Sequence, residues 1–171
     1  DQIAGDNNVS RARFKFPNLN KSFIETGTQK FNYLMKFGYL DTSLNTQIID
    51  LRKSIEDLSR EMRHGHRSDV KSVGKLLSVE IFDAKNITAE AFNKYINLHH
   101  QAAGRVTRSK STFDIMHSAI KQGNAFLSGA KKDSEFVGFA YFFTYKKNTF
   151  YASACNDPDL DLPISHIIQW E

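Results

Sequence analysis

The second half of the chain carries the pattern that most restricts its fold: three strand-like segments separated by short polar connectors. In the middle segment Phe139, Tyr141 and Phe143 recur with the period of two that a strand requires. The connectors Lys131–Ser134 and Lys146–Asn148 are turn-like. We therefore predict an antiparallel meander. Its strands are expected at 125–130, 136–145 and 149–154.

Two helical patterns come before this meander. The first covers 88–103, and the second has Ser111 and Asp114 at the spacing of a capping box and ends at Gly123. A further helix is expected near Ser165. Helices, then a meander, then a helix predict an α+β fold around one sheet. The buried face expected for the second helix consists of Phe113, Ile115, Met116, Ala119 and Ile120.

The region from 44 to 62 supports two interpretations. Its apolar residues recur at spacings of four and three, which favours a single amphipathic helix. A strand at 46–51 followed by a helix from Asp50 or Ser54 is the alternative, and we adopt it because of the resemblance described below. The other elements expected before residue 88 are a strand at 11–16, a helix at 21–39, a helix at 67–75 and a strand at 76–82.

Composition indicates a globular protein of a reducing compartment. Hydrophobic residues make up 40% of the chain and charged residues 25%. Cys155 is the only cysteine, which excludes an intrachain disulfide and a Cys-based metal site. No apolar run reaches the roughly 18–20 residues that span a bilayer, and residues 1–8 are too polar for a signal peptide. We therefore expect a cytoplasmic protein without a transmembrane segment.

Three segments carry a resemblance to a known family. They are His99–Arg108 with Ser111–Phe113, then Glu135–Phe143, and then Tyr151–Asp157 continuing through Ile164–His166 to Gln169–Glu171. Together they resemble the Fem-type (FemAB-like) branch of the GNAT acyltransferase superfamily, which includes bacterial peptidoglycan aminoacyltransferases and enzymes of surface-polysaccharide biosynthesis. The resemblance covers 46–171 and implies a GNAT-like fold, with helices packed on a mixed, largely antiparallel sheet.

The resemblance also implies a division of the chain. Because family members carry two GNAT-like subdomains, residues 1–50 are expected to be the tail of the first and 51–68 a connecting helix. Residues 69–171 would then form the second subdomain, without its final strands. The apolar helical pattern at 167–171 has no stop signal, and we expect the chain to be a fragment truncated at its C-terminus.

The acyl donor is constrained by a missing motif. GNAT enzymes bind coenzyme A pyrophosphate on a Gly-rich turn after the third meander strand, but the last glycine of this chain is Gly138. Asp157, Asp159 and Asp161 occupy the corresponding loop and would repel a phosphate. No cofactor is assigned, and the expected donor is aminoacyl-tRNA or an acyl thioester such as acyl-CoA.

Substrate-binding residues are expected both before and after the meander in the sequence. The resemblance and the guanidinium chemistry make Arg105, Thr107 and Arg108 candidates for phosphate or carboxylate recognition, although arginines after a helix also complement its dipole. Asp157, Ser165 and His166 are the candidates from the loop and the helix after it. The basic stretch 60–75 offers phosphate or tRNA contacts through Arg63, Arg67 and Lys71, or simply a solvated helix face.

Two residues are candidates for catalysis. His100 is a candidate general base because its ordinary pKa is close to neutrality, and Tyr141 is a candidate to reach the acceptor. Packing alone also explains both side chains. No metal site is expected, because His64, His66 and His166 have no suitable carboxylate spacing.

The leading hypothesis is an N-acyltransferase acting on an amino sugar or peptide amine of a cell-envelope precursor. The alternatives are a coenzyme A-dependent acetyltransferase of a nucleotide-linked amino sugar, and a non-catalytic GNAT-like module that binds a partner. The net charge of +4 is compatible with a polyanion such as tRNA or a nucleotide but does not require one.

Overall fold

The computed structural model describes residues 33–40 and 47–171. The chain divides into two compact units, 1–52 and 53–171. In the first unit a 3₁₀ helix, η1 (Tyr33–Phe37), ends at Gly38, whose φ is 81°. The strand expected at 11–16 and most of the helix expected at 21–39 lie outside the described residues. The predicted division at 50 and 68 stays a prediction.

The second unit contains a four-stranded antiparallel sheet in the order β1-β2-β3-β4. The two turns that join the last three strands are tight, and Asp133, Ser134 and Lys146 adopt positive φ there. Such turns twist with the strands they join, and they produce the antiparallel meander that the connectors predicted. The strands are β1 (Ser78–Phe82), β2 (Ala125–Lys132), β3 (Glu135–Tyr145) and β4 (Asn148–Asn156).

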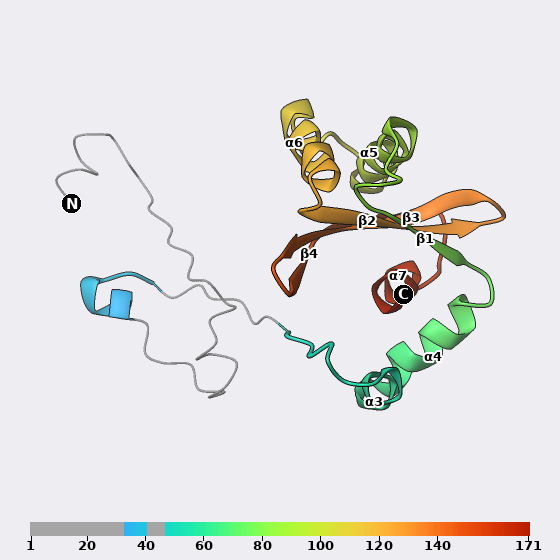
Figure 1. Ribbon diagram of the computed structural model, residues 1–171, viewed down its shortest axis with the longest axis horizontal. Helices are drawn as coiled ribbons and strands as arrows, with labels where there is room; N and C mark the ends of the chain where they lie inside the picture. Colours follow the sequence, from blue (N-terminus) through green and yellow to red (C-terminus); the bar gives the residue numbers. More distant parts are fainter. Residues whose placement is uncertain (1–32, 41–46) are drawn as a thin grey trace. The chain divides into compact units, whose positions relative to one another are not determined.

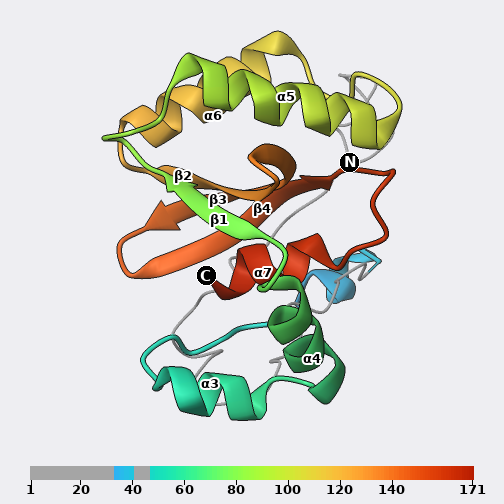
Figure 2. The same cartoon turned by 90° about the vertical axis from the view of Figure 1, so that its right-hand side faces the viewer.

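One face of the sheet is covered by α5 (Ala89–Ala103) and α6 (Lys110–Lys121), as Figure 2 shows. Their N-caps are Thr88, which accepts a hydrogen bond from Ala91 N, and Ser109, which accepts one from Thr112 N. An aromatic core fills the space between these helices and the sheet. Its largest members are Phe82, Phe92, Tyr95, Phe113, Phe139 and Tyr141.

The opposite face is covered by α7 (Ile164–Trp170) and α4 (His64–Val73), with α3 (Ile55–Glu61) beyond them (Figures 1 and 2). Ile164 and Ile167 are buried against the sheet. Burying an aliphatic side chain of this size stabilises the fold by about 1.5–3 kcal/mol. The helices α7 and α4 are therefore held mainly by this second core. Of the helices in 33–40 and 47–171, none has the length and apolar character needed to cross a bilayer.

Three sequence predictions differ from the structure. Residues 47–50 form no strand, although the helix that follows begins after Ser54, one of the two predicted starts, which caps it. The second sheet-covering helix begins at Lys110, because the hydroxyl of Ser109 caps it in place of Ser111. Ile115 was predicted to be buried but is 69% exposed, since it lies off the stripe that faces the sheet.

Candidate active site

The end of α5 and the loop that follows it bring His99 and Arg108 into contact. Gly104 ends the helix in the left-handed conformation, with φ of 63°, which a residue without a Cβ adopts without strain. The chain folds back before α6 begins. Arg108 Nη1 lies 2.6 Å from His99 Nε2, and Thr107 Oγ1 lies 3.4 Å from His99 Nδ1.

Ser153 of β4 points toward the same helix, and a β-bulge lies directly before it. Tyr141 pairs with Ser153 whereas Phe142 pairs with Tyr151, so Ala152 is an extra residue in the register. A bulge interrupts the alternation of side chains between the two faces. Ala152 and Ser153 therefore both face the α5 side of the sheet.

Ser153 is the centre of a small hydrogen-bond network. Its Oγ accepts a hydrogen bond from Arg108 Nη1 at 2.9 Å and another from the hydroxyl of Tyr95 at 2.9 Å. Tyr95 is fully buried and Ser153 nearly so. Burial raises the pKa of Tyr95, which keeps its hydroxyl protonated as a donor. The strand and the helix together fix the guanidinium of Arg108.

His99 is neutral in this arrangement. Burial lowers its pKa, and the positive charge of Arg108 lowers it further. Because a guanidinium only donates, His99 Nε2 must accept the hydrogen bond from Arg108, and the ring proton sits on Nδ1, toward Thr107. His99 Nε2 is thus occupied and holds Arg108 in position.

Arg108 has a charge that no carboxylate neutralises among the described residues. Its side chain is half-buried, and its described hydrogen bonds both use Nη1. A guanidinium carries five N–H groups in a planar fork that matches a carboxylate or a phosphate. The remaining donors leave Arg108 chemically able to bind an anion.

The side chains of the other residues predicted from this region make no hydrogen bond to the network. Arg105 is exposed and has no hydrogen bond or ion pair with a described residue. The His100 ring packs edge-on against Phe113, and its Nε2 is buried without a partner among the described residues. Tyr141 is fully buried and donates to the carbonyl oxygen of Met116 at 2.9 Å. In this structure Tyr141 is therefore a core residue.

The loop after β4 brings Ser165 back to the end of that strand. Asn156, the last residue of the strand, donates from Nδ2 to Ser165 Oγ at 2.9 Å. Its Oδ1 is buried without a partner among the described residues. The Asp157 carboxylate accepts a hydrogen bond from Asp159 N at 3.0 Å and closes its own turn.

His166 belongs to the contact between α7 and α4. Its Nδ1 lies 3.1 Å from Asp69 Oδ2, and its ring centroid lies 4.3 Å from that of His66. Within the described ranges, no group of three or more His, Cys, Asp or Glu residues is arranged to hold a metal ion.

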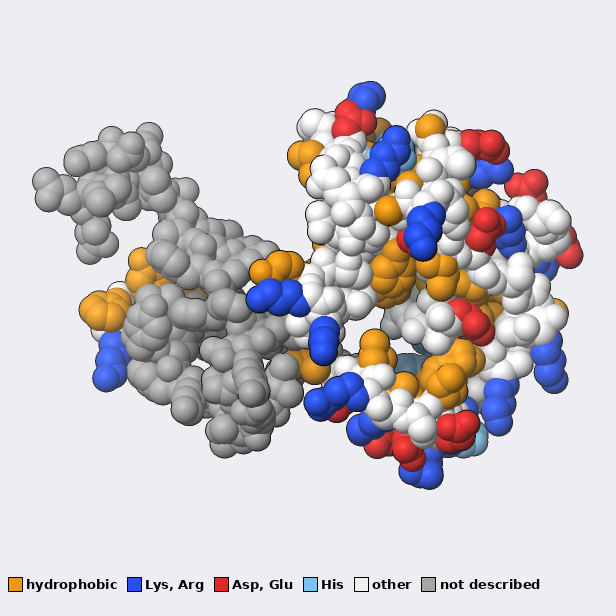
Figure 3. Space-filling view, in the orientation of Figure 1, with side chains coloured by type: hydrophobic (Ala, Val, Ile, Leu, Met, Phe, Trp, Pro, Cys, Tyr) orange, Lys and Arg blue, Asp and Glu red, His pale blue; other side chains and the backbone are white. Residues whose placement is uncertain are grey.

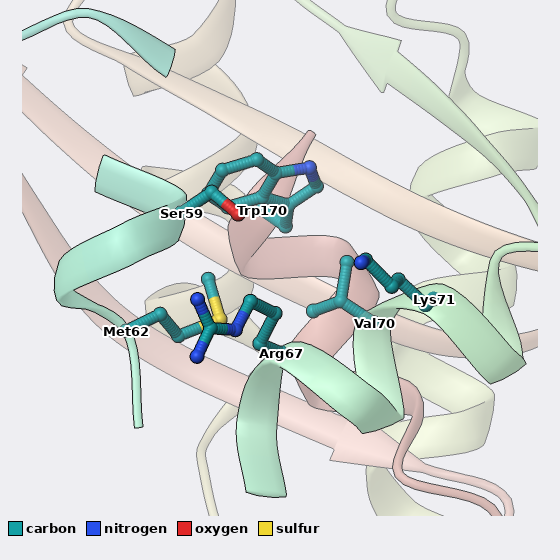
Figure 4. A pocket seen from close by; sticks show the side chains of 6 residues that line it. All are labelled: Ser59, Met62, Arg67, Val70, Lys71 and Trp170. Carbon is teal, nitrogen blue, oxygen red and sulfur yellow. The ribbon is translucent and has the colours of Figure 1, made fainter. Parts of the chain in front are cut away.

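The predicted basic residues lie on α4 and at its start. Arg67 and Lys71 line a pocket of about 110 Å³ together with Trp170 (Figure 4). Arg63 immediately precedes the helix, is exposed and does not line the pocket. In the view of Figure 3, basic and acidic side chains are interspersed over the 53–171 unit.

Sequence reasoning missed Tyr95 and Ser153 and chose His100 rather than its neighbour His99. Tyr95 and Ser153 are 58 positions apart, and alternation from Cys155 gives the face of Ser153 but not the helix residues that it contacts. The Ser-Arg pair is therefore visible only in the folded structure.

Comparison with known proteins shows the fold. No family model and no curated protein matches the chain. A crystal structure of FemX aligns with a TM-score of 0.55 and 13% identity, over 69% of this chain and 46% of that chain. At this identity the likeness concerns the fold alone, and it confirms the predicted GNAT-like α+β architecture. The chain spans less than half the length of FemX.

Two further solved structures align less closely. The ribosomal-protein-alanine N-acetyltransferase of Brucella melitensis biovar Abortus 2308 has a TM-score of 0.38 and 13% identity, over 54% of this chain and 66% of its own. The PaiA N-acetyltransferase from Thermoplasma acidophilum, in complex with coenzyme A, has a TM-score of 0.33 and 14% identity, over 49% of this chain and 62% of its own.

Proposed function

We propose that this GNAT-like chain is part of an N-acyltransferase that acts on an amine of a bacterial cell-envelope precursor, either an amino sugar or a peptide. The observation that carries the proposal is the half-buried cation of Arg108, fixed by His99 and Ser153 beside the bulge of β4. Nucleotide-linked and peptide precursors carry phosphates or carboxylates, which a guanidinium binds with paired hydrogen bonds. Arg108 is thus the proposed anchor for the acceptor.

The reaction needs a neutral amine held next to the acyl carbon. The amine nitrogen forms the new C–N bond, the bond to the departing oxygen or sulfur breaks, and a proton leaves the nitrogen. Arg108 and Thr107 hold the anionic group of the acceptor and orient its amine. His99 is a positioning residue, because its Nε2 already accepts from Arg108.

One of the two predicted catalytic residues is proposed to accept the proton of the amine. The Tyr141 hydroxyl is engaged with Met116 in the core. His100 Nε2 makes no hydrogen bond to a described residue, so His100 is the proposed general base. Asp157 and Ser165, at the other end of β4, are proposed to contact the donor side of the cleft.

The donor is proposed from the charge of the loop at 157–163. A pyrophosphate binds to converging backbone N–H groups of a Gly-rich turn, whereas this loop contains no glycine and has Asp157, Asp159 and Asp161. The carboxylates repel the phosphates of coenzyme A. We therefore propose aminoacyl-tRNA as the donor class, in a cytoplasmic reaction, with an acyl thioester as the competing class.

The experiment offers the protein each donor in parallel. A nucleotide-linked amino sugar and a nucleotide-linked muramyl peptide serve as acceptors, with acetyl-CoA or alanyl-tRNA as donor, and mass spectrometry follows the acceptor. We expect the acceptor to gain one aminoacyl group, and the same acceptor with its amine blocked should gain none.

Each other outcome has a definite meaning. A gain of one acetyl group from acetyl-CoA, with none from alanyl-tRNA, would identify a coenzyme A-dependent acetyltransferase and refute the donor class. Acceptor binding without any transfer would indicate a non-catalytic binding module. Neither binding nor transfer would refute the proposed function.

A further inference from the structure

The pocket among α3, α4 and α7 lies on the face of the sheet opposite to Arg108. Its volume is about 110 Å³, and every polar side chain in its lining can donate a hydrogen bond. A water molecule occupies about 30 Å³ in the liquid, so the pocket has room for a group of several heavy atoms. The lining consists of Ser59, Met62, Arg67, Val70, Lys71 and Trp170.

Two basic side chains line this pocket. Arg67 and Lys71 are four residues apart on α4, which places them on the same side of the helix, and Figure 4 shows both side chains at the pocket. Neither forms an ion pair with a carboxylate among the described residues. Three carboxylates of α3 and α4 are engaged elsewhere: Asp69 with His166, Glu61 with Lys53, and Asp57 with Arg60.

The other walls strengthen the attraction for an anion. Met62, Val70 and the indole of Trp170 form the less polar part of the lining, and charges interact more strongly beside surface of low dielectric constant. The indole N–H is a further donor without a hydrogen bond to a described residue. The pocket thus combines a guanidinium fork, an ammonium group and neutral donors around a space without an acidic side chain in its lining.

We propose that this pocket binds a phosphoryl group. The fork of Arg67 matches two phosphate oxygens, and Lys71 supplies a point charge for the dianion. A small phosphate ester and the backbone of an RNA strand both carry this group, so the chemistry is shared and the sources are separated by experiment. The inference is independent of acyl transfer, because it rests on residues from the opposite face of the sheet.

Trp170 provides a direct reporter, because it is the only tryptophan in the chain. Inorganic phosphate is titrated against tryptophan fluorescence, with sodium chloride at matched ionic strength as the salt control. Separate arms use adenosine monophosphate and a short single-stranded RNA. We expect a saturable fluorescence change with phosphate and with the nucleotide, and none with chloride.

Three charge-removing variants distinguish phosphate binding in the pocket from a general attraction of phosphate to positive charge. Arg67→Gln and Lys71→Gln are each expected to weaken phosphate binding about tenfold or more, since each removes charge-assisted hydrogen bonds. Lys75→Gln removes the same charge just beyond the end of α4, outside the pocket lining, and should change the affinity less than twofold. Circular dichroism checks that each variant keeps its helices.

Several results would overturn this inference. They are the absence of a saturable change with phosphate, an equal change with chloride, or an equal loss in Lys75→Gln and Arg67→Gln. A response to RNA without one to phosphate or the nucleotide would also overturn it. The RNA backbone would then bind to the protein surface without placing a phosphate in the pocket. None of these results alters the mass-spectrometric test of acyl transfer.

Discussion

Replacing Gly138 with Ala should loosen the contact between β3 and α7. A Cβ at this position would lie 2.5 Å from Ile164 Cγ2, 2.9 Å from Asn156 Oδ1 and 3.3 Å from Ile168 Cδ1. The first two distances are shorter than carbon contacts normally allow, so the helix or the strand must move. The end of β4 and the loop after it move with them.

The expected cost is that of overpacking a filled core, about 1–3 kcal/mol in the free energy of unfolding. For a chain of this length each kcal/mol lowers the melting temperature by about 2–4 °C. Gly65→Ala is the matched control, because a Cβ there has nothing within 4 Å and Gly65 lies inside α4. Alanine is the better helix former by about 1 kcal/mol, so the control should be stabilising.

Urea denaturation followed by circular dichroism measures both variants against the wild type. We expect opposite signs, with Gly138→Ala destabilised and Gly65→Ala stabilised. If Gly138→Ala were as stable as the wild type, the close packing of α7 on β3 would be wrong. If Gly65→Ala were destabilised, the open surroundings of α4 at this residue would be wrong.

Three more predictions concern the network and its surroundings. Tyr95→Phe removes the buried hydrogen bond to Ser153 and should cost about 1 kcal/mol in urea unfolding; no loss would contradict that bond. Burial lowers the pKa of His99 and of His117 below the ordinary 6.5, so the unfolded state binds more protons below that pH. Stability should therefore be constant above about pH 6.5 and decrease on acidification below it, and an increase would contradict the neutral, buried histidines. Burial raises the pKa of the Cys155 thiol to about 12, so a disulfide reagent should react slowly with the native protein and fast in urea; prompt native reaction would contradict this burial.

Local signals predicted the second unit well. The α5 helix has Thr88 as its cap and Gly104 after its last turn, and the structure confirms both. The meander followed from two turn-like connectors, and all three of its strands form, each longer at one or both ends than predicted. These features depend on residues that are close in sequence, which is why sequence patterns could predict them.

The sequence predictions were wrong where tertiary contacts decide which residue is buried and which residues contact each other. The buried stripe of α6 is Phe113, Met116 and Ile120, at spacings of three and four, and Ile115 points about 200° away from Phe113 around the helix. Apolar character alone did not distinguish these positions. The bulge at Ala152 has no signature in the sequence. The site partner Ser153 was not predicted, because its contact with Arg108 joins residues 45 positions apart.

The most direct test of the central claim measures whether Arg108 binds the anionic group of the acceptor. Isothermal titration calorimetry follows binding of a nucleotide-linked amino sugar to the wild type, Arg108→Gln and Lys85→Gln, which removes an equal charge from the turn before α5. We predict a loss of about tenfold or more for Arg108→Gln and less than twofold for Lys85→Gln. Equal affinities for the wild type and Arg108→Gln would contradict the account.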